Sequence, residues 1–491
     1  MGFSALDYSI VIAYLLGVTG IGIVISGRQH SSLDYFLGGR NLSWWLVGMS
    51  IVAGETSALT VISVPGIAYA GSLHFLQLAF GFFLGRVIVS LVFIPAYYRG
   101  SLETAYDFLG KRYGLSLRRF TSTVFIVTRV LASGVRLFAT AIPVHMITGL
   151  DYAESILVIG AFTLLYTAVG GLKAVVSLDA LQLLIYLTGA AASLALILHR
   201  LPGGWPDVVA AAGSTGKFSV VNLQPAGSWY SFFSSPYTLA GGLIGGTFLT
   251  MASHGTDQLL VQRLLSCRSR ADSQRALLLD AVLIVIQFAF FLVLGLALFA
   301  LYHGAPYEQL GLQSSDEVFP FFIIHELPSG LAGLMVAGIL ASAMGTLSSS
   351  ISSLASSTFL DLVKHTPYGR SLPPEREIGW SRMLTVFWGL MLIGGAMIFS
   401  DTKNPVVELG LKIASFTYGG LLGTFFLGLL FPRTRPADAF AGFVAGILAM
   451  TAVLRWTSIA YTWHTLIGCA VTLLVGNARP FVMRWVLRRP E

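Results

Sequence analysis

The chain has 491 residues, of which 55% are hydrophobic and only 11% are charged. A soluble domain carries about 25% charged residues, so this composition excludes an ordinary soluble protein and predicts an all-α polytopic membrane protein. The net charge of +7 would also suit a nucleic-acid-binding protein. The basic residues instead concentrate on one side of the membrane, as described below, and this explains the net charge. We therefore expect no nucleic acid partner.

Apolar segments long enough to cross a bilayer recur along the whole chain. A span needs about 20 apolar residues, and we identify about 13 such segments. No loop between them is long enough for a separate soluble domain, so residues 1–491 are expected to form one membrane domain. The segments are 7–26, 43–70, 73–99, 119–148, 152–170, 176–199, 237–264, 275–303, 329–360, 380–400, 404–430, 436–456 and 460–478.

The basic residues indicate how the chain is oriented. If the N-terminus lies outside the cell, most of the 30 Lys and Arg residues fall on the cytoplasmic side, and outside there are only Arg200, Lys217 and Lys403. Cytoplasmic loops carry such an excess of basic residues. We therefore expect a multi-pass protein of the cell (inner) membrane with its N-terminus outside and its C-terminus in the cytoplasm. Lipid is the expected surrounding, and no obligate protein partner is evident.

Two of the segments are interrupted by glycine, proline and polar residues. Segment 43–70 contains Gly54-Glu55-Thr56-Ser57 and then Val64-Pro65-Gly66, and segment 237–264 contains His254-Gly255-Thr256-Asp257. Glycine and proline are common in membrane spans, which is the plainer explanation. However, each interrupted segment opens a block of five segments, 43–199 and 237–430, and this is the pattern of an inverted-repeat transporter. Segment 7–26 would then be an extra N-terminal span, and 436–491 the C-terminal spans and tail.

Hydroxyl side chains concentrate in one later segment. The run Met344-Gly345-Thr346-Leu347-Ser348-Ser349-Ser350 lies within the otherwise apolar segment 329–360. Uncharged hydroxyls at membrane depth suit a desolvated cation or polar solute better than they suit lipid. This run therefore predicts a small-ion site in a transporter.

Four stretches resemble the sodium:solute symporter family, in order and on the matching segments. They are Ala53-Gly54-Glu55-Thr56-Ser57-Ala58 with Val64-Pro65-Gly66; Tyr166 to Val175 with Asp179 and Gln182; Gly255-Thr256-Asp257-Gln258 with Val261-Gln262-Arg263; and Met344 to Asp361. The resemblance covers roughly residues 5–435. It implies a leucine-transporter-like fold of five plus five inverted helices and sodium-coupled transport.

The resemblance also implies a main sodium site. Backbone carbonyls would come from Ala53, Thr56 and Ser342, and hydroxyls from positions 345 and 346. Positions 342, 345 and 346 share one helix face by their spacing, and hard cations prefer oxygen ligands. Na⁺ is thus the expected coupling ion, while no spacing of Cys and His indicates a transition metal.

The chain departs from the family pattern at Gly345, where a serine is usual. Either sodium binds more weakly or another oxygen replaces the hydroxyl, and Glu55 is our candidate for that oxygen. Alternatively, Glu55 titrates and the coupling ion is a proton, or Glu55 forms a salt bridge with a buried arginine. An acid at the break of a buried helix indicates function.

A second sodium site, present in some family members, would comprise Asp179, Ser348 and Ser349. The simpler explanation for Asp179 is an interfacial acid that caps a helix. Near the second interruption, we interpret Gln258, Gln262 and Arg263 as structural residues at a helix end.

Two arginines lie at membrane depth in segment 119–148. Arg129 and Arg136 are seven residues apart and so share a face. An arginine there costs several kcal/mol unless it is paired or hydrated. They either bind a solute carboxylate, for which arginine offers two parallel donors, or pair permanently with Glu55 or Asp179. Arg86 and Lys412 present the same alternatives.

The remaining solute-binding candidates lie at the two interruptions and across the presumed cavity. They are Glu55, Ser57, Thr60, Thr250, His254 and Phe416. A single histidine such as His254 more often donates to a carbonyl than binds a ligand.

The sequence thus favours sodium-coupled secondary active symport of a small polar organic solute by alternating access. The intramembrane arginines favour a carboxylate-bearing solute. The alternatives are proton-coupled symport through Glu55 and a passive channel. A membrane enzyme is disfavoured, because the chain contains no HExxH motif, no GxSxG motif and no cluster of Cys and His.

Overall fold

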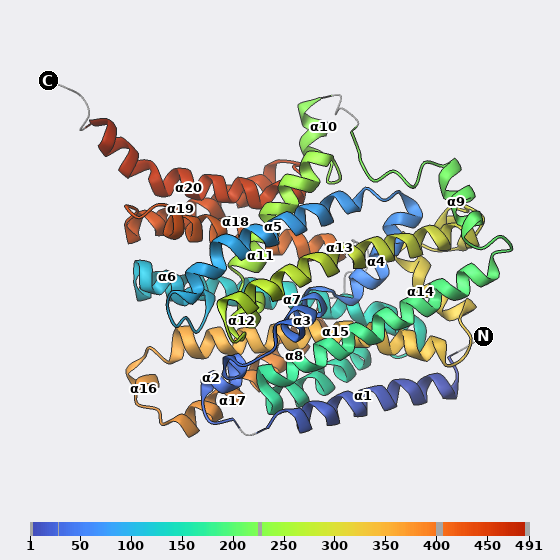
Figure 1. The fold of residues 1–491 in the computed structure, drawn as a ribbon, viewed down its shortest axis with the longest axis horizontal. Helices are drawn as coiled ribbons and strands as arrows, with labels where there is room; N and C mark the ends of the chain where they lie inside the picture. Colours follow the sequence, from blue (N-terminus) through green and yellow to red (C-terminus); the bar gives the residue numbers. More distant parts are fainter. Residues whose placement is uncertain (1–2, 28, 224–227, 399–405, 487–491) are drawn as a thin grey trace.

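The computed structural model describes residues 3–27, 29–223, 228–398 and 406–486. This described part is helical throughout, apart from loops and one isolated bridge between Leu42 and Cys267. In Figure 1 most long helices run side by side, with α1 along the lower edge and α20 along the upper edge. Lys403, which we expected outside the membrane, lies outside the described residues.

Eight helices in the described ranges are long and apolar enough to cross a membrane. They are α1 (Ala5–Ile25), α5 (Phe75–Tyr98), α7 (Leu115–Thr148), α8 (Tyr152–Arg200), α13 (Arg270–Leu301), α15 (Leu331–Ser357), α17 (Pro374–Ile398) and α19 (Pro436–Trp456). The pair α3 (Trp44–Glu55) and α4 (Ala58–Ala70), bent by 68°, adds a broken span. Two further long helices are α18 (Val406–Leu430) and α20 (Tyr461–Val486).

Shorter helical elements connect these spans. They are α2 (Ser32–Leu37), η1 (Gly38–Arg40), α6 (Ala105–Tyr113), α9 (Trp205–Ser214), α10 (Trp229–Ser234), η2 (Gly241–Gly245), α11 (Gly246–Gly255), α12 (Gln258–Leu265), η3 (Tyr307–Leu310), η4 (Ser315–Glu317), α14 (Val318–Glu326), η5 (Thr358–Val363) and α16 (Pro367–Arg370). Every apolar segment expected from the sequence overlaps a helix, while the number of membrane crossings stays a prediction.

The expected segments 152–170 and 176–199 both lie within α8. Its backbone breaks at Gly171, with φ 58° and ψ −160°. Only glycine adopts such a conformation readily, and a side-chain carbon at this position would also lie 2.6 Å from the Tyr35 carbonyl oxygen. One glycine therefore separates two segments between which the sequence suggested a short loop.

The first interruption separates α3 from α4 by two extended residues, Thr56 and Ser57. Neighbouring helices hold this break. Gln287 of α13 donates to the Thr56 hydroxyl at 2.8 Å, and Ser342 of α15 donates to the Thr56 carbonyl at 2.7 Å. The free backbone of a broken span must be satisfied inside the protein, and these contacts fix its position.

The second interruption separates α11 from α12 at Thr256 and Asp257. The Asp257 carboxylate caps α12 by accepting from the Leu259 amide at 2.9 Å. Before the break, η2 and α11 both lie against α5. A side-chain carbon at Gly81 of α5 would be 2.3 Å from the carbonyl oxygen of Gly242 in η2, so the backbones of α5 and η2 touch only because position 81 is glycine.

The hydroxyl-rich helix α15 occupies the interior of the molecule. It packs against α8, α1, α7, α17 and α3. Its polar residues Ser342, Thr346, Ser348 and Ser349 are buried. The hydroxyls therefore face protein rather than the lipid-facing surface, as a site for a polar ligand requires.

Candidate ion and solute sites

The first break and α15 meet where the resemblance implies the main sodium site. The Thr56 carbonyl accepts from the Ser342 hydroxyl at 2.7 Å and lies 3.4 Å from the Thr346 hydroxyl. Thr346 also donates to the Ser342 carbonyl at 3.1 Å. The Ala53 carbonyl lies 3.6 Å from where a side-chain carbon of Gly345 would be. All five residues proposed from the sequence thus lie together, and their oxygens suit a hard cation.

Asp179 lies next to this region, fully buried. One carboxylate oxygen, Oδ2, accepts from the Ser50 hydroxyl at 2.6 Å and from Arg263 at 2.9 Å. The same arginine contacts the Ser349 hydroxyl. We interpreted Arg263 as a residue at a helix end, but its guanidinium reaches across to Asp179 and neutralises it.

The two serines proposed for a second sodium site bond to their own helix. Ser348 and Ser349 donate to the Gly345 carbonyl at 3.0 and 2.5 Å. Because Arg263 lies between Asp179 and Ser349, the positive charge that a second sodium would supply there is already present.

A cavity of about 210 Å³ lies between the two breaks. Its walls come from α3, α4, α5, α7, α11, α12, α13, α18 and α20. Seven of the proposed solute-binding residues line it: Glu55, Ser57, Thr60, Arg129, Arg136, Thr250 and His254. Phe416 is not among the lining residues, whereas Tyr418, two positions further along α18, is.

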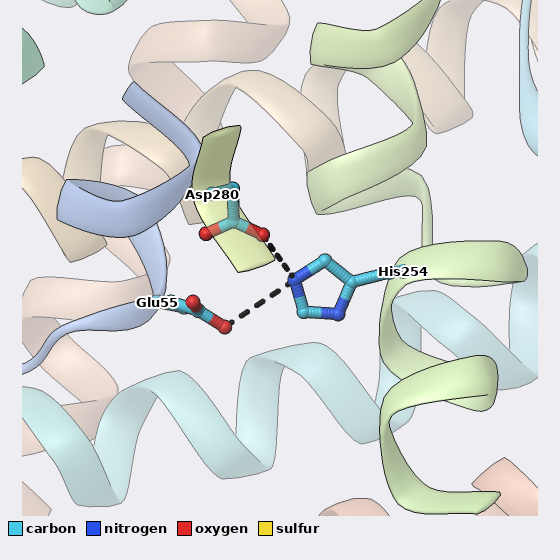
Figure 2. Close-up of side chains that lie close together, drawn as sticks. All are labelled: Glu55, His254 and Asp280. Carbon is cyan, nitrogen blue, oxygen red and sulfur yellow. Dashed lines mark ion pairs between the residues drawn. The ribbon is translucent and has the colours of Figure 1, made fainter. Parts of the chain in front are cut away.

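Glu55 points into a buried charged cluster. Arg86 of α5 pairs with both Glu55 and Asp280 of α13, with its Nε 2.5 Å from Asp280. Figure 2 shows that His254 faces both carboxylates, with its Nε2 3.3 Å from Glu55 and 3.5 Å from Asp280. These three side chains are types that bind divalent metals, but the Arg86 guanidinium already holds both carboxylates. Glu55 therefore has the buried arginine partner that was one of its expected alternatives.

The two arginines of α7 have different surroundings. Arg129 forms an ion pair with Asp257 at the second break, and Tyr418 donates to the same carboxylate at 2.7 Å. Arg136 lines the cavity but forms no hydrogen bond or ion pair through its side chain with the residues that the structure describes. Neither arginine pairs with Glu55 or Asp179. Arg129 is therefore a paired arginine, whereas Arg136 is available to a ligand in the cavity.

Several polar residues of these sites escaped the sequence analysis. Asp280 and Tyr418 were not selected, and Asp257 and Gln182 entered only as parts of motifs. The available signal was an acid inside an apolar segment, as for Asp280 in 275–303, which marks function in membrane proteins. Their partners lie on other helices and could not be read from the sequence.

Comparison with known proteins agrees with this geometry. A sequence profile of the Sodium:solute symporter family matches residues 35–446. The human sodium/iodide cotransporter is 31% identical over 94% of this chain and 71% of its own length. Human sodium-coupled monocarboxylate transporter 1 is also 31% identical, over 93% of this chain and 74% of its own length.

A solved structure shares the whole arrangement of helices. A Na⁺-coupled sialic acid symporter in a substrate-bound outward-open state superposes with a TM-score of 0.87 and 25% identity, covering 98% of each chain. The expected leucine-transporter-like architecture of a multi-pass membrane protein is therefore confirmed. The chain belongs to the sodium:solute symporter family.

Proposed function

We propose that this protein is a sodium-coupled symporter of a small carboxylate-bearing organic anion, with Arg136 as the residue that binds the carboxylate. The observation that carries the proposal is the guanidinium of Arg136, which lines the cavity and has no side-chain partner among the described residues. An arginine at this depth is costly unless something pairs with it. A carboxylate can accept two parallel hydrogen bonds from it.

The charges around the cavity support an anion that enters together with a cation. Arg86 pairs with Glu55 and Asp280 beside the cavity, Arg129 pairs with Asp257, and Arg136 lines the cavity, so three arginines stand against three carboxylates. With His254 neutral, the charges of these groups sum to zero. A sodium ion and a monoanion would therefore bind as a neutral pair, and neither alone would be balanced.

The proposed sodium site and the solute cavity adjoin, which supports coupling between sodium binding and solute binding. Ser57 and Arg136 line the solute cavity and also border a small space of about 10 Å³ that Thr346 lines. A sodium ion that holds Thr56 against α15 would thus also set the position of Ser57. Iodide, monocarboxylates and sialic acid, which the relatives' names mention, are all anions at neutral pH.

The mechanism follows from these contacts. Sodium binding from outside would hold the first break against α15, stabilise the outward-open form and complete the solute site. A rocking motion would then expose both sites to the cytoplasm, where loss of the cation frees the solute. Each sodium ion that moves down a potential of 100 mV supplies roughly 2.3 kcal/mol.

The proposal includes the membrane in which the protein lies and its orientation there. The excess of basic residues on one side supports a location in the cell (inner) membrane with the N-terminus outside and the C-terminus in the cytoplasm. Residues 7–26 would be an extra span and 436–491 the C-terminal spans and tail. We propose no nucleic acid and no obligate protein partner.

Proton coupling through Glu55 loses its main support. That alternative needed an acid free to gain and lose a proton, whereas the Glu55 carboxylate pairs with Arg86. Sodium coupling is therefore the function that we propose.

Uptake into proteoliposomes under an imposed sodium gradient tests the proposal. We expect uptake of an organic anion that vanishes when choline replaces sodium. Arg136→Gln should raise the KM for the anion about tenfold to a hundredfold, because hydrogen bonds to a charged group contribute about 1.5–3 kcal/mol.

Arg200→Gln is the matched control, since Arg200 pairs with Glu326 in partly exposed surroundings. It should leave the KM unchanged. Wild-type uptake without sodium dependence would overturn the proposal, and so would an unchanged KM for every transported anion in Arg136→Gln.

A further inference from the structure

A charged cluster at the wall of the cavity contains more carboxylates than cations. It combines the carboxylates of Glu55 and Asp280 with the guanidinium of Arg86 and the imidazole of His254. The side chains of Arg86 and Asp280 are fully inaccessible, that of His254 is 2% exposed and that of Glu55 is 19% exposed. With a neutral imidazole, the cluster bears one net negative charge. Unbalanced charge in buried surroundings is strongly unfavourable.

The unused acceptor of this cluster lies on Asp280. Its Oδ2 is 2.5 Å from Arg86 Nε and 3.5 Å from His254 Nε2. Its Oδ1 is buried and accepts no hydrogen bond from the residues that the structure describes. Figure 2 shows that the His254 ring nitrogen is directed at both carboxylates. A ring nitrogen that faces two anions must carry a hydrogen, so Nε2 bears one whether the ring is neutral or charged.

The other ring nitrogen has a partner that suits both charge states. His254 Nδ1 lies 2.9 Å from the Ser253 hydroxyl oxygen, and that hydroxyl also lies 3.3 Å from the Thr250 carbonyl oxygen. Beside a neutral ring, the hydroxyl donates to Nδ1. Beside a charged ring, Nδ1 donates to the hydroxyl, which donates to the Thr250 carbonyl instead. Rotation of one hydroxyl therefore accommodates a proton gained or lost at Nδ1. Since Ser253 and His254 line the cavity, a proton can reach this position from there.

Few charged groups control the ring. Glu55 of the first break and Asp280 of α13 face it, and Arg86 of α5 holds both carboxylates. The other elements that pack against α11 are η2, α12, α18 and α20. The helix η2 carries no titratable side chain. Those that the remaining elements and the second break place at the cavity are Asp257, Tyr418 and Tyr461. Asp257 and Tyr418 bond to each other, so the carboxylates and Arg86 dominate the surroundings of His254.

The cluster adjoins the sodium site proposed above. Glu55 lies in the chain between Ala53 and Thr56, whose carbonyls are the proposed backbone ligands. A sodium ion there and a proton on His254 would each place a positive charge beside the Glu55 carboxylate. The two would weaken each other's binding, because like charges repel. Either one would balance the charge of a bound monoanion.

We propose that His254 is a proton-binding site, and that its proton can take the place of sodium in balancing the charge of the bound anion. The inference rests on the proposed symport of an organic anion and extends it to acidic pH. Glu55 keeps its charge and its partner Arg86, so the proton binds to the imidazole and not to the carboxylate. A histidine typically changes its charge between about pH 5 and pH 8. Sodium should therefore be required near neutral pH and become less necessary as the pH falls.

Release of protons on sodium binding tests the site without any solute. Purified protein in weakly buffered choline chloride near pH 6.5 receives NaCl, and an indicator dye records the protons released. We expect the wild type to release a fraction of a proton per molecule, because sodium weakens proton binding by His254. The release should disappear in His254→Gln, whose side chain is polar but cannot become charged.

His325→Gln is the matched control for the loss of a histidine. His325 Nδ1 contacts the Phe321 carbonyl, and the residue does not line the cavity. This variant should release as much as the wild type, and addition of choline chloride in place of NaCl should release nothing. Equal release by the wild type and His254→Gln would show that another group exchanges the proton and would overturn the assignment.

Uptake without sodium tests what the proton does. Proteoliposomes in choline chloride receive an anion that the wild type accumulates with sodium near pH 7.5, and the outside is set near pH 5.5 or pH 7.5. Uptake by protein-free liposomes is subtracted, because protonated acids cross a bilayer unaided. The wild-type rate should be about tenfold higher at the acidic pH, the size of a typical coupling between two ligands. Divided by the sodium-driven rate of the same variant, this response should be absent in His254→Gln.

Ser253→Ala gives a graded test. It removes the hydroxyl that accepts from Nδ1 of the charged ring, so the tenfold response should shrink to a few-fold. A wild-type rate in choline that is the same at both pH values would overturn the role of the proton, while sodium-driven uptake near pH 7.5 would still stand. Absence of sodium-driven uptake near pH 7.5 would overturn the proposed symport itself. The proton release measured without solute still decides whether His254 binds a proton.

Discussion

The two broken segments differ in how their breaks are satisfied. At the first, between α3 and α4, the Thr56 carbonyl faces the hydroxyls of Ser342 and Thr346 on another helix. At the second, between α11 and α12, Asp257 caps its own helix and pairs with Arg129. One break offers backbone oxygens, and the other is closed by a charged side chain.

The two breaks have similar local sequences but differ in what they can bind. The backbone carbonyls at the first break suit a cation that binds reversibly. Their contacts with hydroxyls can rearrange without leaving a buried charge unpaired. The ion pair at the second break cannot open cheaply, because separating buried charges is strongly unfavourable. We therefore assign ion binding to the first break and structural support of the cavity to the second.

The largest expected effect comes from breaking the ion pair at the second break. Asp257→Asn leaves Arg129 without its carboxylate in buried surroundings, which should cost about 3–5 kcal/mol of folding stability. Thermal unfolding of the purified protein in detergent measures this loss.

Asp272→Asn is the control, because Asp272 lies 3.7 Å from Arg275, which is exposed. A change there should stay within about 0.5 kcal/mol. Equal stability of Asp257→Asn and Asp272→Asn would show that the second break does not depend on its ion pair.

A smaller effect, on the apparent affinity for sodium alone, is expected from a change at the first break. Thr346→Val removes a hydroxyl but keeps the shape of the side chain, so the sodium concentration for half-maximal uptake should rise about tenfold. Ser350→Ala, one turn further along α15, is the control and should change it little. Equal shifts in the two variants would contradict the special position of Thr346.

The smallest expected effect concerns the exposure of the cavity. Thr60→Cys places a thiol in the cavity wall, while the natural Cys267 and Cys469 are buried. If sodium stabilises the outward-open form, a membrane-impermeant thiol reagent added outside should label position 60 a few-fold faster in sodium than in choline. In Thr60→Cys/Thr346→Val the same acceleration should need about tenfold more sodium, and a labelling rate independent of sodium in Thr60→Cys would argue against the coupling.

The sequence alone predicted the positions of the helical segments well, because these follow from local hydropathy. The pairing of those charges depends on tertiary structure. Arg129 and Arg136 look equivalent in segment 119–148, and they differ only because Asp257, 128 residues away, reaches the first of them. Arg263, which we interpreted as structural, forms an ion pair with Asp179 that nothing in its own segment indicates.

The solute-site predictions show a similar limit. Phe416 was expected to face the solute, but the rotation of α18 places Tyr418 at the cavity instead.

The N-terminal helix α1 has a consequence for protein engineering. Its Asp7 accepts from the amides of Gly330 and Gly333 at 2.7 Å each, at the start of α15, and its Tyr14 accepts from Gln182. A miniaturised transporter that keeps only the later helices would release the beginning of α15 and let the Gln182 amide turn over. Any such redesign must retain α1 or provide a substitute acceptor for the nitrogen of Gln182.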